Sequence, residues 1–275
     1  MHSLSFFGLA LAFICPVWHS DYDRASNLAI QEKKDLIIHF RGDDYLDEVL
    51  RHEEVRRRLD GFVCLRLPLD YQVRGETLLQ HAAFADMMGF QGLAVLSYRD
   101  KNLPVHGQVI SMHPVVRSHY GWVPRYGVEE VNVILGLPGH ATITQRSMMY
   151  AIHVHPERPQ SIRARCHPAF LDHCRVHSER QAHLRRQHHA DIIASSRRLG
   201  GEVGEALGNA SEVVAESWGM VVGGETVLEA AFSCVDAWRH SSGHWGAVSR
   251  PHRYFGYDIA QGGNGTWYAT GIFSD

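Results

Sequence analysis

The sequence predicts an α/β fold divided between two domains, on three observations. The chain has 275 residues, more than one compact core usually holds. Its first part alternates helical and strand patterns, which predicts a mixed sheet flanked by helices. Its last part has long helical patterns followed by two strands around a glycine-rich turn. We therefore expect domains over residues 20–125 and 168–275, joined by a connector over 126–167.

The elements of the first domain follow from local patterns. Ala25, Leu28 and Ala29 repeat with helical spacing. Short apolar runs such as "LIIHF" at residues 36–40 predict buried strands, and Gly61 ends a charged amphipathic pattern. The predicted order is helix 21–35, strand 36–40, helix 45–61, strand 62–70, helix 75–90, strand 92–100, a turn at 101–102 and a strand near 104–110.

The connector holds two short segments, residues 128–135 and 144–156, that the pattern assigns equally to helix or strand. Pro156 and Pro159 then mark a linker before the second domain.

The second domain begins with one long helical pattern that starts at Pro168 and ends at Gly200-Gly201. A second helix is predicted over residues 225–248, and residues 254–273 read as an antiparallel hairpin. The apolar positions expected to lead the long helix are Leu171, Cys174, Val176, Ile192, Ile193 and Leu199.

The composition excludes some classes of protein. Apolar residues make up 45% and charged residues 21% of the chain, as in ordinary globular proteins rather than disordered ones. A net charge of −3 argues against a nucleic-acid partner held by overall charge. The 20 histidines should add positive charge as the pH falls through about 6.5.

The N-terminus predicts export. The apolar stretch from Phe6 to Trp18 has the length of a signal-peptide core and is shorter than a membrane helix requires, so residues 1–19 are a candidate signal peptide without a transmembrane span. The expected location is secreted or periplasmic. The alternative is an N-terminal strand or helix that docks on the core.

The five cysteines leave the redox chemistry open. Removal of a signal peptide containing Cys15 leaves four, which allows two disulfides without requiring them. No Cys-x-x-Cys occurs in the chain, which excludes a dithiol redox site of that type.

Residues 18–113 resemble a thioredoxin-like domain in the order and spacing of their predicted elements. Residues 33–40, "KKDLIIHF", are similar to that family's central strand. Residues 87–100, "MMGFQGLAVLSYRD", are similar to its later strand and the approach to it.

This domain departs from the family at both of its reactive positions. Residues 41–48, "RGDDYLDE", stand where the family has its Cys-x-x-Cys, and Leu93-Ala94 stand where it has a cis-proline. Thiol–disulfide exchange needs a low-pKa thiolate at the start of that helix, and Asp43-Asp44 supply none. The resemblance therefore implies the fold and a scaffold or docking role, without redox activity.

Residues 168–275 resemble the CAP superfamily (cysteine-rich secretory, antigen 5, pathogenesis-related), in its short bacterial form, as an α-β-α sandwich with antiparallel strands. The similar pieces, in order, are "VVAESWG" at 213–219, "AWRHSSGHWGAV" at 237–248, "YFGYDIA" at 254–260 and "WYATGIF" at 267–273.

The CAP resemblance implies a pocket. It assigns His244 to the family's cavity histidine and Glu216 to its cavity glutamate, although Ser217 replaces the family's asparagine. Trp238 and Ser241 match the same element. We expect Glu216 to hydrogen-bond His244 above a buried Trp238; the alternative is that this pair is only a buried turn.

A divalent cation such as zinc is a weaker expectation. The family's other cavity histidine should follow the long helix, but no histidine occurs between residues 190 and 239, and His189 precedes the predicted helix end. Two ligands are too few for a tight zinc site. His173 and His177 are spaced i, i+4 on one helix face, and with Cys174 they form a second, weaker candidate.

The sequence thus predicts a binding or scaffolding protein with a CAP-like pocket for a protein, lipid or glycan. The alternative is a hydrolase that uses His244 and Glu216, or a metal, in that cleft. No Gly-x-Ser-x-Gly motif and no phosphate-binding glycine loop are present to support other chemistries.

Overall fold

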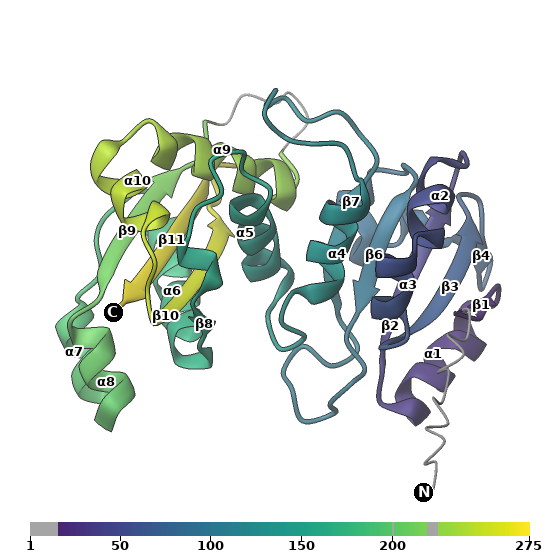
Figure 1. Cartoon of the computed structure of the whole chain (residues 1–275), viewed down its shortest axis with the longest axis horizontal. Helices are drawn as coiled ribbons and strands as arrows, with labels where there is room; N and C mark the ends of the chain where they lie inside the picture. The colour runs from purple at the N-terminus through teal and green to yellow at the C-terminus, as the bar shows by residue number, and fades with distance from the viewer. Residues whose placement is uncertain (1–15, 200, 219–224) are drawn as a thin grey trace, which may run out of the picture.

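The computed structural model describes residues 16–199, 201–218 and 225–275. It is a mixed α/β structure with two larger sheets at opposite ends of the molecule and two helices, α4 and α5, between them (Figure 1). We call residues 16–114 the first half and residues 143–275 the second half.

The first sheet has the strand order β1–β3–β2–β6–β7. Its strands are β1 (Trp18–His19), β2 (Asp35–Arg41), β3 (Phe62–Pro68), β6 (Gly92–Leu96) and β7 (Val109–Pro114). β1, β3 and β2 are parallel, whereas β6 and β7 run antiparallel to their neighbours. Residues 35–40 of the central β2 are all buried, the polar Asp35 and His39 included, which explains why the strand is mostly apolar instead of alternating.

Helices cover both faces of this sheet. α1 (Tyr22–Glu32) packs on one face through Ala25 and Ala29, as the sequence pattern predicts. α2 (Tyr45–Arg51) and α3 (Glu53–Leu59) cover the other face. The single helix predicted over residues 45–61 is wrong: it divides at His52, whose backbone is extended, and acidic residues in the first turn favour the start of α3.

The helix predicted over residues 75–90 is also wrong. β4 (Gln72–Val73) and β5 (Glu76–Thr77) form a small hairpin in which Gly75 has φ +88°, and the 3₁₀ turns η1 (Leu78–Gln80) and η2 (Ala82–Met87) follow. Leu78, Phe84 and Met87 are still buried against the first sheet. The apolar spacing therefore predicts the buried positions correctly, but 3₁₀ turns, and not an α-helix, place these side chains against the sheet.

The predicted connector forms central structure. α4 (Val128–Gly136) and α5 (Ile143–His153) are both helices, and the short elements η3 (Ser161–Arg163) and β8 (Arg165–Cys166) follow. Every residue of α5 from Gln145 to Ile152 is buried, since the helix packs against β7 of the first sheet and against α9 and β10 of the second half, to which it belongs. A helix that is buried on all sides has no amphipathic period, so the sequence pattern could not distinguish helix from strand in this segment.

The second sheet has the order β8–β10–β11–β9. β10 (Tyr254–Gln261) and β11 (Trp267–Ser274) form the predicted antiparallel hairpin, and β9 (Ser211–Glu216) pairs antiparallel with β11. α6 (Pro168–Leu184) covers one face so closely that a Cβ at Gly256 would lie 2.5 Å from the Phe170 carbonyl carbon. α9 (Val227–Arg239) and α10 (Ser242–Ser249) lie on the other face.

The long helix predicted from Pro168 is interrupted. α6 ends at Leu184 because Arg185 adopts φ 52° and its N–H caps the last turn. The chain then folds back, with the His188 N–H donating to Gln181 Oε1, before α7 (Ile192–Leu199) and α8 (Gly201–Gly208). Val176 and Ile193, expected on the apolar side, are 41% and 59% exposed.

The candidate signal peptide lies mostly outside the described residues, as does Cys15. Trp18 and His19 pair with β3 in the first sheet. The other four cysteines, Cys64, Cys166, Cys174 and Cys234, are free. Within the described ranges, none of the helices has the length and apolar character that crossing a membrane requires.

Candidate binding pocket

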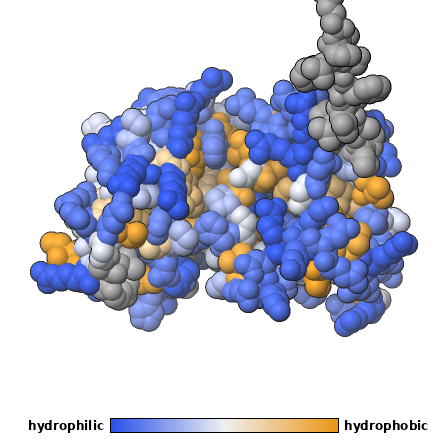
Figure 2. Space-filling view, turned by 60° about the horizontal axis from the view of Figure 1, so that its bottom comes forward, coloured by the Kyte–Doolittle hydropathy of each residue, from blue (hydrophilic) through white to orange (hydrophobic). Residues whose placement is uncertain are grey.

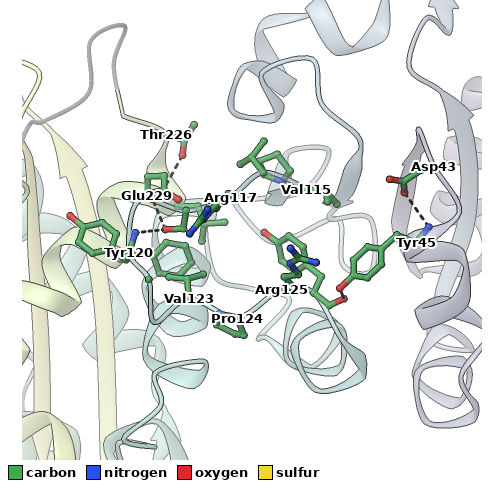
Figure 3. A pocket seen from close by; sticks show the side chains of 17 residues that line it. Asp43, Tyr45, Val115, Arg117, Tyr120, Val123, Pro124, Arg125, Thr226 and Glu229 are labelled. Atoms are coloured by element: carbon green, nitrogen blue, oxygen red, sulfur yellow. Dashed lines mark hydrogen bonds between the residues drawn. The ribbon is translucent and has the colours of Figure 1, made fainter.

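A cavity of about 680 Å³ lies between the two halves (Figure 3). Asp43 and Tyr45, just before and at the start of α2, form one side. The other side is formed by Thr226, the N-cap residue of α9, and by Glu229 and Phe232 in the first two turns of that helix. Side chains of residues 114–126 lie between them. We call residues 115–127, which run from β7 to α4, the crossing loop.

The first half fixes its side of the pocket through backbone contacts. Gln91, just before β6, accepts hydrogen bonds from the Gly42 and Asp43 N–H groups through Oε1, at 3.2 and 2.8 Å. The Gln91 side chain and the Tyr45 N–H lower the pKa of Asp43, which is therefore ionised at neutral pH. The Tyr45 hydroxyl donates to the Tyr126 carbonyl at 2.9 Å and holds the end of the crossing loop.

The second half holds the crossing loop by α9. Glu229 accepts from the Ser118 hydroxyl at 3.2 Å and from the His119 N–H at 3.3 Å. The Trp122 indole N–H donates to Asp236 at 3.2 Å. The loop is therefore anchored on both halves, and the cavity between them is preformed.

A further contact joins the halves beside the pocket. The Asp86 carboxylate in η2 accepts from the Val227 N–H at 3.1 Å, and the Thr226 side chain caps α9 by accepting from the Glu229 N–H at 3.2 Å. Both occupy N–H groups that a helix start leaves without partners. They fix the end of α9 that faces the cavity.

Two arginines of the crossing loop extend into the space between the walls. Figure 3 shows Arg117 and Arg125 between Tyr45 on one side and Glu229 on the other. Both side chains are exposed, and neither forms an ion pair within the described part of the chain. Apolar side chains dominate the rest of the lining: Val115, Val116, Val123, Leu228 and Phe232.

The structure places the sequence-predicted residues elsewhere in the second half. His244 lies in α10, so "SSGHWGAV" is mostly helical, and Ser241 is the N-cap residue. Glu216 is exposed at the end of β9 and accepts from the Gln187 N–H at 2.7 Å. Among the described contacts there is no hydrogen bond or ion pair between Glu216 and His244. Trp238 is fully buried and packs against Tyr257.

His189 approaches His244. Because α6 ends early, His189 lies in the loop after the helix, and its ring centroid is 6.4 Å from that of His244. Burial, and then the neighbouring His189, lower the pKa of His244. The sequence pattern predicted an uninterrupted helix through His189, and for that reason it did not place His189 near His244.

Glu212 is the carboxylate that gathers histidines in this region. Its side chain is 2% exposed, and its oxygens lie 2.9 Å from His189 Nδ1, 3.7 Å from His173 Nε2 and 3.9 Å from His177 Nε2. The alternation of β9 places Glu212 on the same face as Glu216, which is the signal that could have identified it.

The candidate metal ligands only partly come together. His173 and His177 share one face of α6, with ring centroids 6.4 Å apart, but Cys174 is buried with Phe170 and Tyr254. Over residues 16–199, 201–218 and 225–275, no group of three or more histidine, cysteine or acidic side chains could hold a metal ion. The donor set therefore does not fit the divalent cation that the CAP resemblance implies.

Comparisons with protein-family models, curated proteins and solved structures found no match to this chain.

Proposed function

We propose that this protein binds a small molecule in the pocket between its halves and has no catalytic role. The carrying observation is a preformed cavity of about 680 Å³ lined by both halves. Ligand sites of small molecules commonly measure about 300–1,000 Å³, have mostly apolar walls and contain a few placed polar groups. The contacts of Tyr45, Ser118 and Trp122 hold these walls before any ligand arrives.

The fold assignments belong to the same proposal. The order β1–β3–β2–β6–β7, in which β6 alone runs opposite to the other four strands, supports a thioredoxin-like first half. In that reading, Asp43 stands at the former dithiol position and now lines a binding pocket. The antiparallel strands β10–β11–β9 between α6 and α9 support a CAP-like second half. The apolar N-terminal segment supports export.

Blocking the pocket tests the proposal. A panel of small molecules is screened by thermal shift, and each ligand that stabilises the protein is titrated by calorimetry. Val116 lines the cavity, so Val116→Trp should abolish binding by filling it. Val176→Trp, which adds the same ring on the exposed surface of α6, should leave binding unchanged. Ligands that bind equally to both variants would show that the pocket is not the site.

A hydrolase acting through His189 and His244 is the second candidate, favoured by the approach of their rings to 6.4 Å. An imidazole pair can transfer protons if a cleft presents a substrate to it. Chromogenic esters and peptides test this candidate. The binding proposal expects no turnover above background, whereas turnover lost in both His189→Ala and His244→Ala would establish the hydrolase.

A further inference from the structure

We infer that the ligand of this pocket is a singly charged organic acid with an apolar body, such as an aryl or alkyl carboxylate. The inference rests on the proposed function and names its ligand class. Three observations carry it: the unpaired arginines, the apolar walls and the charge balance of the lining.

The arginines provide the site for an anion. Arg117 and Arg125 both line the cavity, and neither has an acidic partner within the described ranges. A guanidinium binds a carboxylate through two parallel hydrogen bonds, a geometry that favours a planar carboxylate.

The walls require an apolar body. Val115, Val123, Leu228 and Phe232 line the cavity together with the ring of Tyr126. Burial raises the pKa of Tyr126, so that its phenol stays neutral beside the ligand. A small inorganic anion would leave this surface in contact with water, whereas an aryl or alkyl group would cover it.

The charge balance favours one negative charge. The carboxylates in the lining are Asp43 and Glu229, which oppose the two arginines and bring their formal sum to zero. The Asp43 carboxylate accepts from the Tyr45 N–H, and the Glu229 carboxylate accepts from Ser118 and from the His119 N–H; neither is ion-paired with Arg117 or Arg125 in the described part of the chain. A second negative charge on the ligand would be repelled by the Asp43 and Glu229 carboxylates, and among the described residues no further positive side chain lines the cavity to offset that repulsion. We therefore expect a carboxylate to bind more tightly than a phosphate monoester with the same body.

Matched probes separate the charge from the body. Calorimetric titration of the full chain uses 2-naphthoate, neutral 2-naphthamide and doubly charged 2-naphthyl phosphate, with decanoate and decanamide as the alkyl pair. We expect each carboxylate to bind at least tenfold more tightly than its amide, and naphthyl phosphate to bind more weakly than naphthoate. The preference should fall at least fivefold in Arg117→Gln/Arg125→Gln, with amide binding unchanged.

Arg180→Gln is the matched control, because Arg180 is an exposed arginine on α6. It should retain the full preference for the carboxylate. Amides that bind as tightly as the acids would overturn the inferred ligand class and leave the pocket as a binding site. Tighter binding of naphthyl phosphate would overturn the single charge. If none of the probes binds, the inferred ligand class fails, and the panel of small molecules still tests the pocket. If ligands of that panel bind Val116→Trp unchanged, the proposed function itself fails.

Discussion

The carboxyl group of Asp258 in β10 is buried between the hydroxyl groups of Thr144 and Ser178. Ser178 Oγ lies 2.6 Å from Asp258 Oδ2 and 2.5 Å from the Cys174 carbonyl, and both would be acceptors if Asp258 were ionised. One hydroxyl proton cannot serve both. A protonated Asp258 that donates to Ser178, which in turn donates to Cys174, satisfies every group. Consistently, burial raises the pKa of Asp258 from 3.8 to about 7.

This raised pKa predicts a pH dependence of stability. Since the folded pKa exceeds the unfolded one, the contribution of Asp258 is fully present below about pH 4 and is lost as the pH rises through about 7. Asp258→Asn keeps a neutral donor and should therefore raise the free energy of unfolding at pH 8 by more than about 1 kcal/mol. Urea denaturation at pH 5 and pH 8 measures this, with the exposed Asp70→Asn as control. An equal effect at both pH values would contradict it.

The buried histidines act in the opposite sense. Burial lowers the pKa of His39 to about 4 and of His113 to about 3, so the stability that their neutral forms contribute is present above about pH 6.5 and is lost in acid. Burial is also the first cause of the lowered pKa of His140, His153, His155, His167, His177 and His244. The folded protein therefore gains less charge in mild acid than its composition suggests.

Glu212 and Glu216 differ in burial, and we expect them to differ in their contribution to stability. Both are on β9, but Glu212 is buried among imidazoles and accepts from the Ala190 N–H, whereas Glu216 is exposed and accepts from the Gln187 N–H. Glu212→Gln should cost about 1.5–3 kcal/mol, as for hydrogen bonds to a buried charge. Glu216→Gln should cost less than about 0.5 kcal/mol. Thermal denaturation of the two variants measures both losses of stability. Equal losses would contradict the buried role of Glu212.

At the scale of elements, Arg146 connects α5 to the end of α4. Its buried guanidinium donates to the carbonyls of Ile134, Leu137 and Pro138 at 2.8–3.0 Å and to the Ser111 hydroxyl in β7 at 2.6 Å. The last carbonyls of a helix have no partners inside the helix, so this side chain replaces water that cannot reach them.

Removing this cap should destabilise both helices. Arg146→Met keeps much of the aliphatic volume but leaves the carbonyls without donors, and should cost more than about 2 kcal/mol. Hydrogen exchange in α4 should rise more than in α1, which packs on the far face of the first sheet. Arg163→Met, at an exposed arginine, is the control and should cost less than about 0.5 kcal/mol. Comparable losses in the two variants would contradict the capping role.

At the scale of the whole molecule, one apolar cluster joins the two halves. It includes Ile37 and Val95 of the first sheet, Met149 of α5 and Tyr257 of the second sheet. On the face shown in Figure 2, polar residues cover most of the surface, and apolar residues are visible in the hollow between the halves. Because the halves share a core, we expect them to unfold together.

Met149→Ala tests this shared core. The side chain is fully buried, so its loss should cost about 2–5 kcal/mol. The midpoints reported by exchange in β2 and in β11 should move to lower urea concentration by the same amount. Wild-type protein should show a single transition by both probes. A shift confined to one half, or two separate transitions, would contradict a common core.

The sequence by itself determined those elements whose patterns are local. The buried run of β2, the apolar spacing of α1 and the hairpin of β10 and β11 all follow from neighbouring residues. It also identified His173 and His177 as sharing one helix face. Helical spacing and turn chemistry are fixed within a few residues, so they can be read without knowledge of the fold.

Only the tertiary structure decided the breaks in the helices and both clusters of functional groups. α6 ends at Leu184, and the chain folds back so that the His188 N–H donates to the Gln181 side chain, which itself donates to Thr270 in β11. This return of the chain brings His189 to Glu212. The pocket likewise depends on contacts such as Ser118 with Glu229, 111 residues apart. Such pairings stabilise the fold only after distant segments have met, and they leave no periodic pattern along the chain.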